Sequence, residues 1–174
     1  MFEKNEGRRR EAASLWDAFE KKRVYGTSGP RILLWFDLLG EKEPRPMGSE
    51  VATRDAPVFR VRAVGSLEQA EGCPASTLAA LGPERTASLC AGECYRPTDK
   101  RRRISHIDVV RIRPQIRPGE DPASLIDDPF KRFACPPDPE GCVATFVDPE
   151  YPALGRDTVY YARAFEEPSP AVNG

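Results

Sequence analysis

Proline constrains the fold of this chain more than any other residue type. Eighteen of its 174 residues are proline, roughly twice the usual share of about 5%. Most stand between apolar runs, as Pro44, Pro46 and the Pro136-Pro137 pair do. Because proline interrupts helices and central strands, this spacing predicts many short elements joined by fixed loops.

The segment 6–23 is proline-free and has the pattern of an amphipathic helix. Four of its apolar side chains recur at three- and four-residue spacing, which places them on one stripe of a helix. These four are Ala12, Leu15, Trp16 and Phe19. Asn5 is suited to cap the start of the helix, and Lys21, Lys22 and Arg23 suit its last turn. Gly26 then forbids continuation.

Five later runs have the residue pattern of β-strands. They are 31–39, 57–64, 104–113, 142–147 and 158–165. In 57–64, apolar and arginine side chains alternate, which is the period of a half-buried strand. One helix followed by five such runs predicts a mainly β fold, an antiparallel β-sandwich-like domain preceded by one N-terminal α-helix. The segments 66–94 and 114–137 are expected to be irregular insertions, with a helical turn at 77–81.

Charge and hydropathy disfavour two classes of partner. Lys and Arg number 26 against 27 for Asp and Glu, so no overall charge favours nucleic acid or an anionic membrane. No apolar run approaches the roughly 18 residues that span a bilayer. The basic cluster 100–103 is interpreted as a solvated loop, and Arg111, Arg113 and Arg117 are expected to form a charged strand face.

The cysteines are Cys73, Cys90, Cys94, Cys135 and Cys142, and all are disulfide candidates. Five is an odd number, so one is free or paired outside this chain. Cys135 and Cys142 enclose Pro-Pro-Asp-Pro-Glu-Gly, a turn sequence that would bring their sulfurs within bridging range. Four of the five lie in loop-like sequence, which favours disulfides and a periplasmic or secreted location. Scattered reduced cysteines in a cytosolic protein are the alternative.

The sequence offers no catalytic or metal-binding constellation. Cys90 and Cys94 lack the two-residue separation of a zinc knuckle, and no Cys-x-x-Cys occurs. His106 is the only histidine and is expected to be a surface or lightly packed strand residue. Asp108 would share its face, but an isolated pair of ligands seldom suffices for a metal.

The turn between the helix and the first strand is the segment best suited to approach a ligand. It runs Tyr25-Gly-Thr-Ser-Gly-Pro-Arg31, and its glycines allow close approach of the backbone. Thr27 and Ser28 add hydroxyl groups there. A tight connection between a helix and a strand needs the same residue types, so both interpretations stay open.

Residues 10–31 resemble the end of the catalytic barrel in a bacterial family of unknown function. That family is similar to the polymerase-and-histidinol-phosphatase (PHP) metallohydrolases, near the carbaryl-hydrolase-like group. In it a last barrel helix leads through a Tyr-x-Thr-Ser/Asn-Gly-Pro turn into a strand of an appended β-domain. Further segments that resemble its C-terminal region are 46–48, 92–97, 110–114, 135–142 and 160–168.

The resemblance implies a division of the chain and a role for it. Residues 1–30 would be the last barrel helix and its turn, and 31–174 an accessory β-sandwich, truncated at its C-terminal end. The histidine-rich ligand motifs of such hydrolases are missing here, so the expected divalent metal would belong to a missing N-terminal barrel. This chain would be the non-catalytic C-terminal portion of a phosphoesterase-like hydrolase, with Thr27, Ser28 and Arg31 near its cleft.

Two further expectations follow from these interpretations. If the barrel is the partner, then Leu15, Trp16 and Phe19 should face it and form an exposed apolar patch in this chain alone. The other interpretation is a self-contained extracytoplasmic module that binds glycan or protein through its loops. Exposed aromatic side chains in the Tyr95 or Tyr151 loops would favour this second interpretation.

Overall fold

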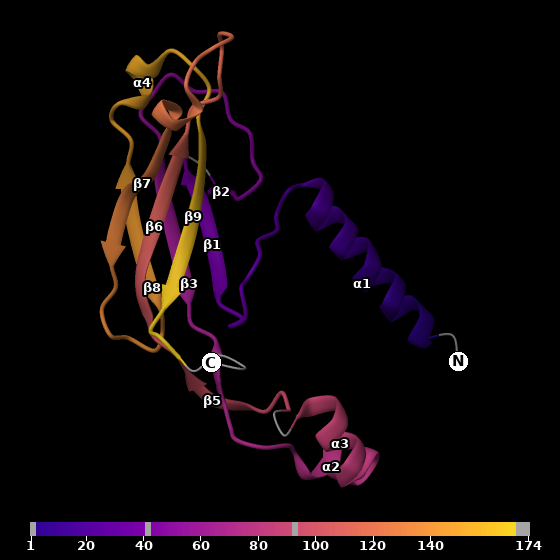
Figure 1. The fold of residues 1–174 in the computed structure, drawn as a ribbon. Helices are drawn as coiled ribbons and strands as arrows, with labels where there is room; N and C mark the ends of the chain where they lie inside the picture. The colour runs from indigo at the N-terminus through magenta and orange to yellow at the C-terminus, as the bar shows by residue number, and fades with distance from the viewer. Residues whose placement is uncertain (1–2, 41–42, 92–93, 170–174) are drawn as a thin grey trace.

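Two antiparallel β-sheets that face each other form the centre of the protein in the computed structural model (Figure 1). The structure describes residues 3–40, 43–91 and 94–169. The first sheet has the order β2-β1-β3-β8 and the second the order β7-β6-β9. The strands of the first sheet are β1 (Leu33–Leu39), β2 (Arg45–Pro46), β3 (Val58–Val64) and β8 (Cys142–Val147). Those of the second are β6 (Ile104–Ile112), β7 (Ile126–Ala134) and β9 (Val159–Glu166).

These sheets confirm the predicted fold class. The chain is mainly β, its strand pairs are antiparallel, and one helix precedes them, while the sandwich-like arrangement is not closed. All five predicted strands are present, with ends within two residues of the expected positions. The alternation of side chains along each strand explains the match, because one face of each sheet must be apolar to pack against the other.

The core lies between the two sheets. Phe36, Phe59 and Phe146 come from β1, β3 and β8, and their ring centroids are 5.2 to 6.4 Å apart. Ile107 and Val109 of β6 are fully buried in the same cluster. Each such side chain stabilises the fold by about 1.5–3 kcal/mol. This apolar contact is the main force that holds the sheets together.

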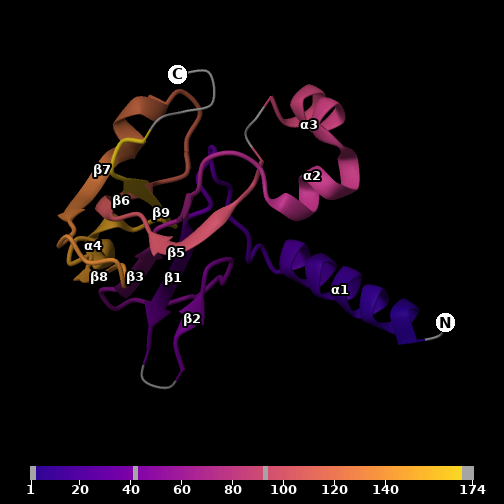
Figure 2. The same ribbon diagram turned by 90° about the horizontal axis from the view of Figure 1, so that it is seen from below.

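Helix α1 (Glu3–Glu20) projects away from the sandwich (Figures 1 and 2). It begins before the predicted start, so Asn5 lies inside the helix and the expectation that it caps the helix is wrong. The helix ends before the glycines. Lys22 adopts a left-handed backbone (φ 54°), its N–H bonds the carbonyl of Phe19, and Arg23 N–H bonds that of Ala18. This Schellman arrangement satisfies the last carbonyls without glycine.

The loop after β2 holds the C-terminal end of α1. Gly48 has φ +84°, and a Cβ there would lie 2.1 Å from the carbonyl oxygen of Lys21. Only glycine allows this approach of two backbones. Lys22 Nζ also lies 2.5 Å from Glu50 Oε1. The helix is therefore attached at one end while its remaining length extends from the domain.

The predicted irregular insertions contain regular structure. Segment 66–94 forms the strand β4 (Leu67–Gln69) and the helices α2 (Ala75–Leu81) and α3 (Pro83–Cys90). Strand β5 (Pro97–Arg101) pairs with β4, and this unit protrudes from one end of the sandwich (Figure 1). The expected helical turn at 77–81 is confirmed as part of α2. Segment 114–137 contains a 3-10 turn (Pro122–Leu125) and all of β7. A short helix α4 (Tyr151–Leu154) precedes β9.

Candidate functional site

A pocket of about 710 Å³ lies between β1 and β9, beside the loop after β2. Phe36, Phe59 and Tyr160 line it, so side chains of both sheets contribute. Lys22 and Glu50, which join the end of α1 to the loop, also line it. The pocket therefore combines aromatic walls with a charged rim, which is the usual composition of a binding pocket.

Thr158 adds a polar group to this pocket. Its Oγ1 is buried and has no hydrogen-bond partner among the described residues. A buried hydroxyl without a partner costs about 1–3 kcal/mol. Tyr151 lines the same pocket and donates its phenolic hydrogen to the carbonyl of Thr53, at 3.4 Å. A ligand with a hydrogen-bonding group could satisfy Thr158 there.

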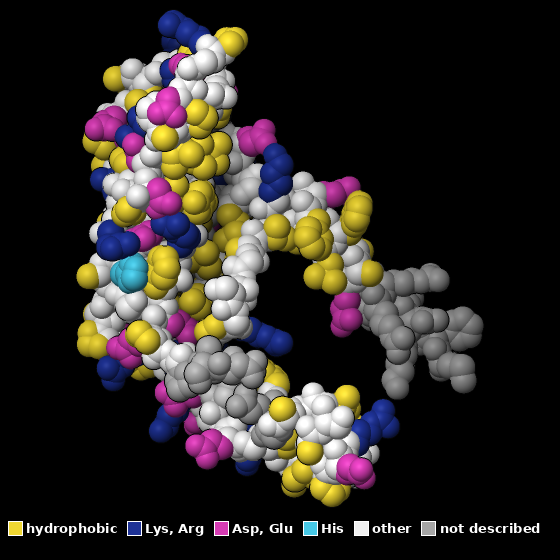
Figure 3. All heavy atoms as spheres, in the orientation of Figure 1, with side chains coloured by type: hydrophobic (Ala, Val, Ile, Leu, Met, Phe, Trp, Pro, Cys, Tyr) yellow, Lys and Arg dark blue, Asp and Glu magenta, His cyan; other side chains and the backbone are white. Residues whose placement is uncertain are grey.

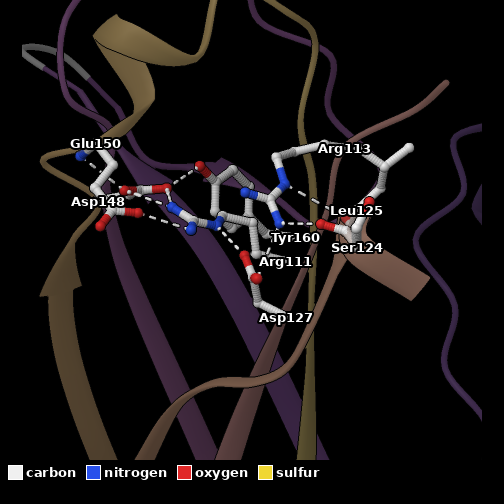
Figure 4. A network of polar contacts seen from close by, with 8 residues as sticks. All are labelled: Arg111, Arg113, Ser124, Leu125, Asp127, Asp148, Glu150 and Tyr160. Carbon is white, nitrogen blue, oxygen red and sulfur yellow. Dashed lines mark hydrogen bonds and ion pairs between the residues drawn. The ribbon is translucent and has the colours of Figure 1, made fainter. Parts of the chain in front are cut away.

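A buried ion network adjoins the pocket through Tyr160 (Figure 4). The Arg111 guanidinium lies within 2.7 to 2.9 Å of carboxylate oxygens of Asp127, Asp148 and Glu150. The Tyr160 hydroxyl donates to Asp148 Oδ2 at 2.6 Å. The network links β6, β7 and β9 of one sheet to the segment after β8 of the other.

The pKa shifts of Asp148, Arg111 and Tyr160 keep these three groups in one protonation state near neutral pH. Burial alone would raise the pKa of Asp148, but the hydrogen bonds from Tyr160 and Arg111 outweigh it and lower that pKa. Burial alone would lower the pKa of Arg111, but the hydrogen bonds to its carboxylate partners outweigh burial and raise that pKa above its ordinary value. Burial and the Asp148 carboxylate together raise the pKa of Tyr160. The network therefore serves to connect the two sheets and is poorly suited to acid–base catalysis.

The expectation that Arg111 contributes to a charged strand face with Arg113 and Arg117 is wrong, because Arg111 is buried. The side chain at this position follows Ile107 and Val109 inward, because β6 alternates, and three carboxylates neutralise its charge at the end of the core. Arg113 is half-buried and donates to Asp127 Oδ1 at 2.9 Å. Arg117 is exposed but lies in the loop after β6, so it is not part of a strand face.

His106 and Asp108 lie on the outer face of the second sheet. The imidazole is half-buried and stacks on Phe165, with ring centroids 4.4 Å apart, in agreement with a lightly packed strand residue. Asp108 is 1% exposed and accepts two hydrogen bonds from Arg132, at 2.7 and 2.8 Å. These bonds lower the pKa of Asp108. Both carboxylate oxygens of Asp108 thus accept hydrogen bonds from Arg132, so Asp108 is poorly placed to bind a metal.

The three residues expected near a cleft lie in the connection between α1 and β1. Thr27, Ser28 and Arg31 are all exposed. The Arg31 guanidinium lies 4.9 Å from the centre of the Tyr95 ring, a cation–π contact with the segment that precedes β5. None of the three lines the pocket described above. Their role beside the cleft of another polypeptide stays a prediction.

Both disulfides lie toward the same end of the sandwich, where β3 ends and β6 begins. The predicted bond between Cys135 and Cys142 is present and connects the end of β7 to the start of β8. Cys73 is bonded to Cys94, which ties the start of the α2–α3 unit to the approach to β5. Cys90 is free, and this accounts for the odd number of cysteines.

The apolar face of α1 is exposed. Leu15, Trp16 and Phe19 are 63%, 66% and 63% exposed, and Figure 3 shows hydrophobic side chains along this projecting helix. The expected patch is therefore present. Sequence periodicity found this surface, whereas it gave no signal for the pocket, whose walls come from strands distant in sequence.

Comparisons with models of protein families, with curated proteins and with solved structures found no match. Within the described ranges, no helix has both the length and the apolar character needed to cross a bilayer. The function is therefore inferred from the surfaces described above. Among these surfaces, the apolar face of α1 gives the clearest indication of a binding partner.

Proposed function

We propose that this chain is a non-catalytic accessory domain that packs on the barrel of a PHP-like, metal-dependent hydrolase through α1. One observation carries this proposal: Leu15, Trp16 and Phe19 are about two-thirds exposed on one face of a helix that projects from the sandwich. A helix with this face on the outside is suited to lie in an apolar groove of a partner.

The size of the exposed side chains favours a lasting contact. Complete burial of one large apolar side chain contributes about 1.5–3 kcal/mol, and three lie together here. Aromatic residues are also over-represented among those that dominate binding energy at interfaces. Gly48 and the Lys22–Glu50 ion pair hold the base of the helix, so the domain presents this face in a defined position.

The resemblance of residues 10–31 to the end of a catalytic barrel supports a barrel as the partner. Under this proposal the divalent metal and the hydrolytic chemistry belong to that barrel, and Thr27, Ser28 and Arg31 lie close to its cleft. The two disulfides support an extracytoplasmic location, because such bonds persist in oxidising compartments. The accessory domain would orient the barrel and cover part of its surface.

Photocrosslinking in the source cells tests the proposal. A photoreactive amino acid at Trp16 should give an adduct with a polypeptide that carries the His-x-His pair of a metal-binding barrel. The matched control places the probe at Asp17, which lies on the other side of the helix and is ion-paired with Lys21 at 2.6 Å. Adducts only between two copies of this chain, or equal adducts from both positions, would contradict the proposal.

The pocket supports a second candidate function, a binding module for glycan or protein. Aromatic walls and the unpartnered hydroxyl of Thr158 are features that a sugar or a peptide would use. Tyr95 is exposed, which favours this candidate, whereas Tyr151 is half-buried. Titration calorimetry with soluble oligosaccharides tests this candidate. Binding that weakens about tenfold in Thr158→Val would support it, and heat that is equal for both proteins would not.

A further inference from the structure

Three sulfur atoms meet where the α2–α3 unit joins β5. The Sγ atoms of Cys73, Cys90 and Cys94 all lie within 4.8 Å of one another, and all three residues are half-buried. Cys73 and Cys94 form a disulfide, and Cys90 is a free thiol. A structural disulfide has no need of a third sulfur beside it.

The backbone brings the third sulfur to this position. Cys90 is the last residue of α3, and Ala91 follows in a left-handed conformation with φ 46°. Ala91 ends the helix, and Cys94 follows Cys90 by four positions in the sequence. The free thiol therefore stands at the end of a helix and lies beside the disulfide.

We propose that Cys73, Cys90 and Cys94 form a thiol–disulfide exchange centre. The Cys90 thiolate attacks the Sγ of Cys94, a Cys90–Cys94 bond forms, and the Cys73–Cys94 bond breaks. The electron pair of the broken bond leaves on Cys73, which takes up the proton that Cys90 lost. Neither an external oxidant nor a reductant is needed, because one disulfide and one thiol are present before and after the step.

The exchange changes what the disulfide holds together. The Cys73–Cys94 bond ties the segment before α2 to the approach to β5, and 20 residues that include both helices lie between the two sulfurs. A Cys90–Cys94 bond encloses three residues and leaves the start of α2 untethered. The free thiol then belongs to Cys73. The centre is thus also a modification site. Either Cys90 or Cys73 carries the free thiol, and that thiol can react with a low-molecular-weight disulfide.

Peptide mapping distinguishes the two bonds without ambiguity. Trypsin leaves Cys90 and Cys94 on one peptide, 86–100, because Pro97 blocks cleavage after Arg96, and it leaves Cys73 on another, 63–85. The Cys73–Cys94 bond joins these two peptides, whereas a Cys90–Cys94 bond lies within one of them. Cleavage after Glu93 separates Cys90 from Cys94 and identifies a bond between Cys73 and Cys90.

Slow labelling of the native, unreduced protein with dilute iodoacetamide tests the exchange. About a tenth or more of the label is expected on Cys73, because Cys90 and Cys73 alternate as the free thiol. The Cys90→Ser variant is the matched control, and its label on Cys73 should fall about tenfold since the attacking thiol is gone. In Cys73→Ser, oxidation should give a Cys90–Cys94 bond. Label confined to Cys90 at every reagent concentration would overturn the proposal.

Discussion

The guanidinium of Arg111 donates to both carboxylate oxygens of Asp148, at 3.1 and 2.9 Å, and both side chains are almost fully shielded from solvent. Arg111 belongs to β6 of the second sheet, and Asp148 follows β8 of the first. The pair is therefore a polar link across a sandwich that is otherwise held by apolar contacts. The pair contributes to stability only while both charges are present, because removal of one leaves the other buried without a counter-charge.

The Arg111→Met variant should be destabilised by about 3–5 kcal/mol, because Asp148 is then buried with its main counter-charge removed. Urea unfolding followed by circular dichroism measures this change. Arg113→Met is the matched control, since Arg113 is half-buried and Arg111 still neutralises Asp127. Its cost should stay below about 1.5 kcal/mol. Equal costs for the two variants would show that burial of the pair is unimportant.

Stability should fall in acid. The hydrogen bonds from Tyr160 and Arg111 lower the pKa of Asp148 in the folded protein, although burial opposes this. The folded state therefore binds fewer protons than the unfolded state. The stabilisation is complete above the ordinary carboxylate pKa of about 4 and is lost as the pH falls through the lower folded pKa.

Thermal unfolding between pH 7 and pH 2 checks this direction. The Asp148→Asn variant should be less stable at neutral pH and should lose less stability in acid, because its side chain does not titrate. The Asp108 carboxylate, whose pKa Arg132 lowers, remains in both proteins and contributes a common acid-sensitive component. A parallel decline of the two proteins would exclude Asp148 as a source of the effect.

The helix and the strands with regular alternation could be predicted, because their patterns depend on neighbouring residues alone. Strand β7 could not, since Pro129 and four charged residues interrupt its apolar pattern. Proline is tolerated there because β7 is an edge strand and its register with β6 shifts beside Pro129. Edge position is a property of the whole sheet, which a local pattern does not report.

The ion network and the cysteine pairing depend on contacts between distant residues. Arg111 and Asp148 are 37 positions apart, and Cys73 pairs with Cys94 across both helices of the protrusion. The Cys135–Cys142 bond could be predicted because a short turn sequence separates the two residues. Charge patterning alone placed Arg111 on a charged strand face, since the three acids that neutralise it come from other segments.

Loss of the Cys135–Cys142 bond should destabilise the sandwich. The bond closes a loop of only a few residues, for which chain entropy gives about 2–3 kcal/mol. The double variant Cys135→Ala/Cys142→Ala should lower the free energy of unfolding by at least this amount, because Cys142 is also 3% exposed in the core. Cys90→Ser, which removes the free thiol, should change it by less than about 0.5 kcal/mol. Comparable losses in both variants would contradict this assignment.

The attachment of α1 depends on the absence of a side chain at Gly48. A Cβ there would lie 2.1 Å from the Lys21 carbonyl oxygen, so Gly48→Ala should displace the end of the helix from the loop. The expected result is tryptic cleavage after Lys21 and Lys22 that is about tenfold faster, a local loss of roughly 1–2 kcal/mol. Gly29→Ala is the control, since Gly29 also has a positive φ, +102°, but open space around its Cβ. Equal cleavage rates in Gly48→Ala and the control would contradict this prediction. The positive φ alone would then account for glycine at position 48, and the contact would not be needed to hold the helix.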